Sequence, residues 1–360
     1  MTKKTLLLLL LILFITLPVM GATVRYGYFR SVLNFTRQPD TLNSGALNKL
    51  RYYFESQYGD YLGSRIALDF KTFNGNQDKP APDQDFLSLY RAAGTIHLPG
   101  TDVTLGKQRI AWGTGTVWDP TDLFYSFRLI DPEEDVPGVL GIRIERPLST
   151  FTGIDIYAVS QNADLNTFVS ALKYRGNFRL LNYSLIYAYN GFTDRQIWGM
   201  DFRQDFDGGK LYGEATCTVP KTAGQYLKLV LGSNYTFLGG LNLNLEYYFN
   251  GAGAVQPVNY AWNQFAGIST PLARDYVFVR TIKAITQDIL FTNNLIFNLN
   301  DGGFLLYPVS NWIIEDGIEL NFEGLFFFGN KGSEFNPTLT QDPAGKSNYN
   351  SAYAKFKFAF

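Results

Sequence analysis

The sequence predicts an all-β fold: a transmembrane antiparallel β-barrel of about 18 strands, with 16 as the alternative, preceded by a cleaved signal peptide. Three observations predict it. The final residues, SAYAKFKFAF, alternate apolar and polar to the very end and place Phe356, Phe358 and Phe360 on one face. The rest of the chain divides into similar alternating stretches separated by turn residues. The long connections between these stretches all fall on one side of the expected sheet.

The N-terminal segment has the three regions of a secretory signal peptide. Lys3 and Lys4 precede an apolar run over 6–17, and Pro18 follows, with Val19 and Gly21 at the positions that flank a plausible cleavage site. The run is short for a membrane-spanning helix, which needs about 20 residues. We therefore expect two parts, a signal peptide over 1–21 and a barrel over 22–360.

The composition agrees with a barrel wall and excludes several other classes. Hydrophobic residues make up 46% but the mean hydropathy is −0.08, so apolar and polar residues are finely mixed. Aromatic residues reach 16%, and charged residues are 18%, below the ~25% of soluble domains. A net charge of −1 gives no reason to expect a nucleic-acid partner. The single Cys217 excludes an intrachain disulfide and a cysteine metal cluster, and we expect no cofactor or metal.

Eighteen strands are expected from the alternation and the turn residues between them. Their ranges are 23–36, 46–56, 62–73, 84–98, 103–112, 138–147, 153–161, 167–175, 178–190, 196–206, 210–219, 226–237, 241–250, 273–285, 289–299, 304–314, 318–328 and 350–360.

The connections test this division independently. If the first strand runs outward, the connections after even-numbered strands lie in the periplasm and should be tight. All eight have five residues or fewer, and most contain Gly, Asp or Asn. The long connections all follow odd-numbered strands, at 37–45, 74–83, 113–137, 251–272 and 329–349. This asymmetry favours an outer-membrane barrel over a soluble sandwich, which would show the same alternation.

The charged faces of the strands are expected to face the lumen. A Lys or Arg that faces lipid at mid-depth costs about 2–4 kcal/mol, and a barrel of this width encloses water. The candidate lumen-facing residues of the wall are Lys49, Arg51, Glu55, Arg65, Asp69, Lys71, Arg91, Arg143 and Glu145.

Two stretches resemble known outer-membrane proteins. The C-terminal strand resembles that of Gram-negative outer-membrane β-barrels, which ends in Phe and is read by the barrel-assembly machinery. The segment 105–124, LGKQRIAWGTGTVWDPTDLF, resembles a motif of porin-like and alginate-export-like barrels. The matching residues are Gly106, Lys107, Gln108, Trp112, Gly113, Asp119, Pro120 and Asp122, with Asp119 where Asn is more usual. The resemblance implies a porin-like channel and identifies no substrate.

The connection 113–137 is the candidate constriction of the pore. It carries six acids and one base: Asp119, Asp122, Arg128, Asp131, Glu133, Glu134 and Asp135. Folded into the barrel, the acids would face wall bases and create a transverse field. Two alternatives stay open: the acids are solvated, or they bind divalent ions at the lipopolysaccharide surface.

Other distinctive residues have plainer interpretations. The connection 251–272 has Tyr260, Trp262 and Phe265, which suit loop packing more than a sugar slide or a cap. Trp112, Trp198 and Trp312 lie near strand ends and suit interfacial girdles. His97, the single histidine, lies at a periplasmic turn, so we expect no enzyme.

The sequence thus predicts a bacterial outer-membrane channel for passive diffusion of small hydrophilic solutes or ions. The alternatives are a channel for export or uptake of an alginate-like polysaccharide, and a structural or adhesive surface barrel with a closed lumen. Expected partners are outer-membrane lipid and lipopolysaccharide, the barrel-assembly machinery, the small solutes themselves, and further copies of the chain in a homo-oligomer.

Overall fold

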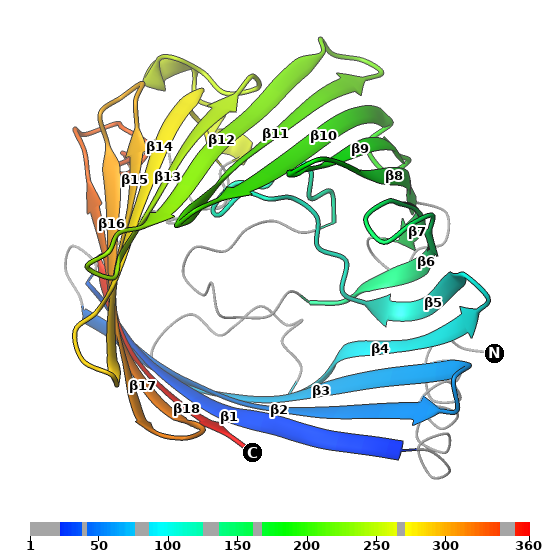
Figure 1. The fold of residues 1–360 in the computed structure, drawn as a ribbon. Coiled ribbons are helices and arrows are strands. Elements are labelled where there is room, and N and C mark those ends of the chain that lie inside the picture. Colours follow the sequence, from blue (N-terminus) through cyan, green and yellow to red (C-terminus); the bar gives the residue numbers. More distant parts are fainter. Residues whose placement is uncertain are drawn as a thin grey trace.

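The computed structural model describes residues 22–37, 42–75, 86–124, 137–160, 168–264, 271–338 and 350–360. The expected signal peptide, 1–21, lies outside the described residues, so that prediction stays untested. The described chain forms one closed ring of β-strands (Figure 1).

The eighteen strands follow the predicted order closely. They are β1 (Ala22–Arg37), β2 (Leu42–Tyr58), β3 (Leu62–Gly75), β4 (Leu87–Leu98), β5 (Thr101–Gln108), β6 (Val139–Pro147), β7 (Gly153–Ser160), β8 (Phe168–Phe178), β9 (Leu181–Asn190), β10 (Arg195–Phe206), β11 (Gly209–Pro220), β12 (Tyr226–Thr236), β13 (Leu241–Asn250), β14 (Asp275–Ala284), β15 (Ile289–Asn298), β16 (Phe304–Glu315), β17 (Ile318–Phe328) and β18 (Ser351–Ala359).

The sheet closes on itself because its last strand pairs with its first. Each strand pairs antiparallel with its neighbour in sequence, and β18 pairs with β1, so that Phe356 lies opposite Ser31 and Phe358 opposite Phe29. Closure satisfies the backbone hydrogen bonds of both edges. The predicted 18-stranded antiparallel barrel is confirmed, and the alternative of 16 strands is wrong.

The connections after even-numbered strands are all tight, and we call this end of the barrel the short-turn end. The opposite, long-loop end carries the extended connections, including 109–138, 251–274 and 329–350. Two 3₁₀ helices, η2 (Pro257–Asn259) and η3 (Trp262–Gln264), lie in the second of these. Among the described residues, no helix combines the length and the apolarity that a membrane crossing requires.

Alternation divides each strand between the interior and the outer surface. In β13, Asn244, Glu246 and Tyr248 face inward and are buried, whereas Leu245 between them is 45% exposed. The interior is not uniformly polar. In β9 the inward residues are Ile186 and Ala188, both buried, because a segment inside the barrel covers them.

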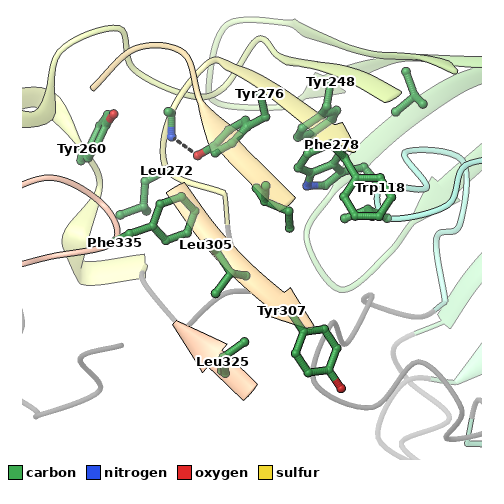
Figure 2. Packing of buried hydrophobic residues seen from close by; sticks show 14 of the residues in the cluster. Trp118, Tyr248, Tyr260, Leu272, Tyr276, Phe278, Leu305, Tyr307, Leu325 and Phe335 are labelled. Carbon is green, nitrogen blue, oxygen red and sulfur yellow. Dashed lines mark hydrogen bonds between the residues drawn. The ribbon is translucent and has the colours of Figure 1, made fainter. Parts of the chain in front are cut away.

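The largest interior cluster lies against β11–β17. It contains aromatic residues of β13 and β14, among them Tyr248, Tyr276 and Phe278, with Trp118 packed over them (Figure 2). Trp118 and Tyr248 stack with ring centroids 5.0 Å apart. Trp118 belongs to the connection after β5, so part of that connection lies inside the barrel.

Candidate pore constriction

Residues 109–124 leave the wall after β5 and run through the interior (Figure 1). Strand 103–112 was predicted to continue to Trp112, but β5 ends at Gln108. Ile110 and Trp112 pack against inward residues of β7–β10. Trp112 makes an edge contact with Tyr157, at 4.8 Å between ring centroids. The prediction that Trp112 belongs to an interfacial girdle is therefore wrong: its ring is buried in the lumen.

Glu214 of β11 binds the middle of this segment. Its Oε1 accepts the N–H groups of Thr114 and Gly115, the latter at 2.7 Å. Its Oε2 accepts the N–H and the hydroxyl of Thr121, at 3.1 and 2.8 Å. Backbone donors thus surround a buried carboxylate, which compensates for its loss of water.

Glu246 of β13 binds the next residues in the same way. Its Oε2 accepts the N–H of Thr116 at 2.6 Å, and its Oε1 accepts the N–H groups of Val117 and Trp118 at 3.2 and 3.1 Å. The hydroxyl of Tyr212 donates to the same carboxylate at 3.0 Å. Two wall glutamates therefore fix the course of the segment across the lumen.

Two glycines allow this close approach. Gly113 has φ +94°, and a Cβ there would lie 2.7 Å from both Asp119 Oδ1 and Glu214 Oε1. A Cβ on Gly115 would lie 2.1 Å from the carbonyl oxygen of Trp118. Neither position tolerates a side chain, which explains the Gly-Thr-Gly sequence of the segment.

Asp119 lies beside the two wall glutamates. Burial, with the added repulsion of the Glu214 and Glu246 charges, raises the pKa of Asp119 to about 9. Asp119 is therefore neutral at pH 7. The sequence predicts that this acid faces wall bases, but in the structure Asp119 lies beside two carboxylates.

Asp122 accepts the N–H of Phe124 at 3.1 Å, which closes a local turn. Arg128, Asp131, Glu133, Glu134 and Asp135 lie outside the described residues.

The motif residues have structural positions that account for their pattern. Gly106 adopts φ +116° at the point where β5 meets β4. The Gln108 side-chain amide donates to the carbonyl oxygens of Thr104 and Gly141, at 3.1 and 3.2 Å. Pro120 precedes Thr121, whose side chain is fully buried against Glu214. These residues direct the chain inward and hold it there.

The wall formed by β1–β6 carries basic side chains, in contrast to the acids Glu214 and Glu246 of β11 and β13. Arg51 and Asp69 form a buried two-contact ion pair, with N–O distances of 2.5 and 2.7 Å. The Arg51 guanidinium lies 3.2 Å from the centroid of the Tyr90 ring. Tyr90 is the extra residue of a β-bulge in β4, because Arg91 pairs with Ala67 while Leu89 pairs with Leu68. Tyr90 and Arg91 therefore both face inward.

The remaining predicted wall residues also lie on the inward face, and most are ion-paired. Arg65 contacts Glu55 at 2.8 Å, Arg143 contacts Glu145 at 3.0 Å, and Lys71 lies 3.9 Å from Asp69. Lys49 is buried beside the Tyr28 ring. On β18, Lys355 and Lys357 face inward and contact Glu323 and Glu319, while Phe356, Phe358 and Phe360 face outward.

Two cavities open between this wall and the interior segment. One has a volume of about 590 Å³, and its charged lining consists of five bases and Glu55, with His97 near the short-turn end. The other measures about 390 Å³, and the described residues that line it include no acid. Arg65, Arg91 and Arg109 line both. Among the described residues, the charged lining of the two cavities is therefore mainly basic, and the acids Glu214 and Glu246 are covered by the segment 109–124.

Sequence reasoning missed four of the residues that build this site. They are Glu214, Glu246, Tyr90 and Arg109. Alternation places Glu246 on the inward face, but the backbone N–H groups that the two glutamates accept lie 93 to 130 residues away in sequence, so no local pattern marks these contacts. The bulge at Tyr90 is likewise set by pairing with β3.

The other aromatic and histidine predictions fall away from the passage. Tyr260 is buried and its hydroxyl contacts Asp301 at 3.1 Å, as loop packing requires; Phe265 lies outside the described residues. Trp198 and Trp312 are exposed on the outer face. His97 Nδ1 lies 2.8 Å from Asp102 Oδ1. Within the described ranges, no group of three or more His, Cys, Asp or Glu side chains has the arrangement of a metal site.

Comparison with known proteins adds evidence at the level of the fold. No protein-family model matches the sequence, and no curated protein is similar to it. Among solved structures, mutants of Rhodopseudomonas blastica porin superpose with a TM-score of 0.51 at 13% or 14% identity, over 94% of this chain and 100% of that chain. The outer membrane protein OprD from Pseudomonas aeruginosa superposes with a TM-score of 0.62 at 9% identity, over 95% of this chain and 94% of that chain. The chain therefore has the closed antiparallel barrel fold of the outer-membrane porins.

Proposed function

We propose that this protein is a porin-like channel of the bacterial outer membrane that conducts small hydrophilic solutes downhill and prefers anions. The observation that carries the proposal is the lining of the two cavities, where Arg65, Arg91 and Arg109 are shared and bases outnumber acids. Positive charge along a narrow wet passage with low-dielectric walls raises the local concentration of anions.

The outer surface supports a location in a membrane. The outward faces of the strands carry Leu, Ile, Val, Phe, Tyr and Trp, such as Leu231, Leu245 and Trp198, and closure leaves no unpaired strand edge for lipid to meet. In the proposed orientation the short-turn end faces the periplasm and the long loops face outward. The C-terminal Phe face would then be the part that the assembly machinery reads, and lipopolysaccharide would surround the long-loop end.

Planar-bilayer recording of the purified protein tests the proposal. We expect large ohmic current steps and, in a potassium chloride gradient, a reversal potential whose sign corresponds to chloride preference. Replacing Arg91 and Arg109 by Gln should move the reversal potential towards potassium. Arg25→Gln is the matched control, because Arg25 pairs with Phe54 on the outward face of the wall. An absence of conductance contradicts the channel, and potassium preference in the unaltered protein contradicts the anion preference alone.

A second candidate is a channel for an acidic polysaccharide. The same observation favours it, because arginines shared between two adjoining cavities present successive positive charges to an extended polyanion. Oligomers of a uronic acid added to one side of the bilayer distinguish the two. Long, voltage-dependent blocks at micromolar oligomer favour the polysaccharide channel, whereas block only at the concentrations at which a simple monocarboxylate blocks favours the general porin.

A further inference from the structure

Two basic side chains of the β10–β12 wall lie together on the inner face. Arg195 comes two residues before the buried Ile197 of β10, and Lys228 comes two residues before the buried Val230 of β12. Because alternate residues of a strand share a face, both side chains point inward, as does that of Tyr226. Strands β10–β12 lie across the barrel from β1–β3 (Figure 1), so this pair is separate from the bases that line the two cavities.

Tyr226 connects the two cations. The Arg195 guanidinium donates to the Tyr226 hydroxyl at 3.4 Å, and the Lys228 ammonium lies 6.0 Å from the centroid of the Tyr226 ring. A hydroxyl that accepts a hydrogen bond keeps its own proton for donation. All three side chains are half-buried. A guanidinium, an ammonium and a phenol O–H therefore gather at one place on the wall.

The acids nearest to this place bind other groups. Asp194, the neighbour of Arg195 in sequence, contacts the Lys221 ammonium at 2.7 Å and accepts the Tyr189 hydroxyl at 2.9 Å. The inward acids of β10–β13 also have partners: Asp201 with Lys173, Asp205 with Arg203, and Glu214 and Glu246 with the segment 109–124. Within the described part of the chain, no carboxylate forms an ion pair with Arg195 or Lys228, and the charge that acts on Lys228 is that of Arg195.

This pair lies on the long-loop side of the segment 109–124. Val230 is opposite Glu214, which binds the segment. Lys228 lies one inward position closer to the long-loop end, at which β12 begins. The linings of the two described cavities include neither cation. A solute that enters from the long-loop end therefore meets this pair before it meets the segment.

We propose that Arg195 and Lys228, together with Tyr226, form an entry subsite that binds the oxyanion group, carboxylate or phosphate, of a solute arriving from the long-loop end. This inference deepens the proposed anion-conducting channel and rests on it. A guanidinium binds two oxygens of such a group at once, and an ammonium beside it adds a second charge-assisted hydrogen bond. Two like charges held close together repel each other, and a bound anion relieves that repulsion.

Chemical footprinting of the unaltered protein tests the subsite. Phenylglyoxal modifies accessible arginines, and peptide mass spectrometry gives the rate of modification at each one. The rate at Arg195 is measured in a phosphate-free buffer to which malonate or inorganic phosphate is then added in increasing amounts. Arg179 is the control, because it is exposed in the β8–β9 turn at the opposite end of the barrel.

We expect either anion to slow the modification of Arg195 several-fold and saturably, and to leave the rate at Arg179 unchanged. Lys228→Gln should leave Arg195 reactive but remove most of this protection, whereas Lys228→Arg should retain it. The heat-dependent gel shift verifies that both variants are folded. The subsite is overturned if neither anion protects Arg195 in the unaltered protein, if Arg179 is slowed equally, or if Lys228→Gln is protected as fully as the unaltered protein.

Lipopolysaccharide is another source of phosphate groups, and it is added in a separate arm. Protection of Arg195 by lipopolysaccharide but by neither malonate nor free phosphate would assign the site to a lipid headgroup, and the solute subsite would be wrong. Planar-bilayer recording separates this inference from the proposed function. Conductance without protection of Arg195 refutes the entry subsite alone. Protection in a protein that forms no conducting channel contradicts the channel and with it the entry role, and leaves an oxyanion-binding site.

Discussion

Glu246 in the wall accepts the backbone N–H of Thr116 at 2.6 Å, across 130 residues of sequence. Together with Glu214, it holds the segment 109–124, which follows β5, against β11 and β13, which come much later in the sequence. The geometry of the passage therefore depends on carboxylates that line no part of either described cavity.

Replacing both Glu214 and Glu246 by Gln should release the segment 109–124 from the wall. A hydrogen bond to a charged group contributes about 1.5–3 kcal/mol to stability. The neutral Gln side chains would weaken several such bonds at once. We expect open-channel current noise to rise several-fold and the unfolding temperature to fall. Glu315→Gln, at the end of β16, is the control. Noise equal to that of the unaltered channel would show that these bonds do not hold the segment.

Docking of the segment should weaken as pH rises. Asp119 has its pKa raised to about 9 when buried, whereas the released carboxyl has the ordinary value of about 3.9. Between these values the docked form holds the extra proton, so docking is strongest in acid and declines up to about pH 9, by at most about 1.4 kcal/mol per pH unit. Current noise should therefore increase from pH 6 to pH 9. Asp119→Asn should abolish this dependence, and an unchanged dependence in that variant would exclude Asp119 as its source.

Gly113→Ala should disturb the same segment by a steric route. The added Cβ would lie 2.7 Å from Asp119 and Glu214 at a φ of +94°, a strain of about 1–3 kcal/mol. We expect a lower transition temperature in the heat-dependent gel shift that reports barrel unfolding. Gly224→Ala is the matched control, because no atom lies within 4 Å of its Cβ position. Equal transition temperatures for the two variants would refute the steric account.

Asp69→Asn should destabilise the barrel strongly. It leaves the Arg51 guanidinium buried without its carboxylate, which costs about 3–5 kcal/mol. The transition temperature of the gel shift measures the loss. Glu55→Gln breaks the more exposed pair with Arg65 and should cost under about 1 kcal/mol. Similar losses in the two variants would mean that burial does not distinguish the pairs.

Neutralising Glu133, Glu134 and Asp135 together should shift the ion selectivity further towards anions. These residues lie outside the described part of the chain, and the expectation rests on the sequence alone. The reversal potential in a salt gradient is the measurement. Unchanged selectivity would place these acids away from the passage.

Strand number and order could be predicted from the sequence because both depend on local signals. Alternation identifies a strand, and Gly or Asp at a turn ends it, as at Asp207-Gly208 and Asp316-Gly317. The end of β5 could not be predicted, because apolar residues such as Ile110 and Trp112 continue the alternation after the chain has left the wall.

The candidate site could be predicted only in part. The inward direction of Arg51, Arg65 and Arg143 follows from alternation alone. Alternation also places Glu246 on the inward face, but no local signal shows the role of Glu214 and Glu246, because both accept N–H groups of a distant loop. Trp112 shows the same limit, since an aromatic residue at a strand end suits a membrane interface and a packed interior equally well.

In a regularly alternating strand, each added inward side chain brings a neighbour that faces outward. Tyr90 escapes this coupling because it is an extra residue between Leu89, which pairs with Leu68, and Arg91, which pairs with Ala67. The extra residue places an aromatic ring beneath Arg51 in the interior. Leu89 and Ala92 still pair with outward residues of β3. An insertion of one residue in a strand can therefore add a side chain to the interior of a barrel while the outward face of the strand keeps its sequence.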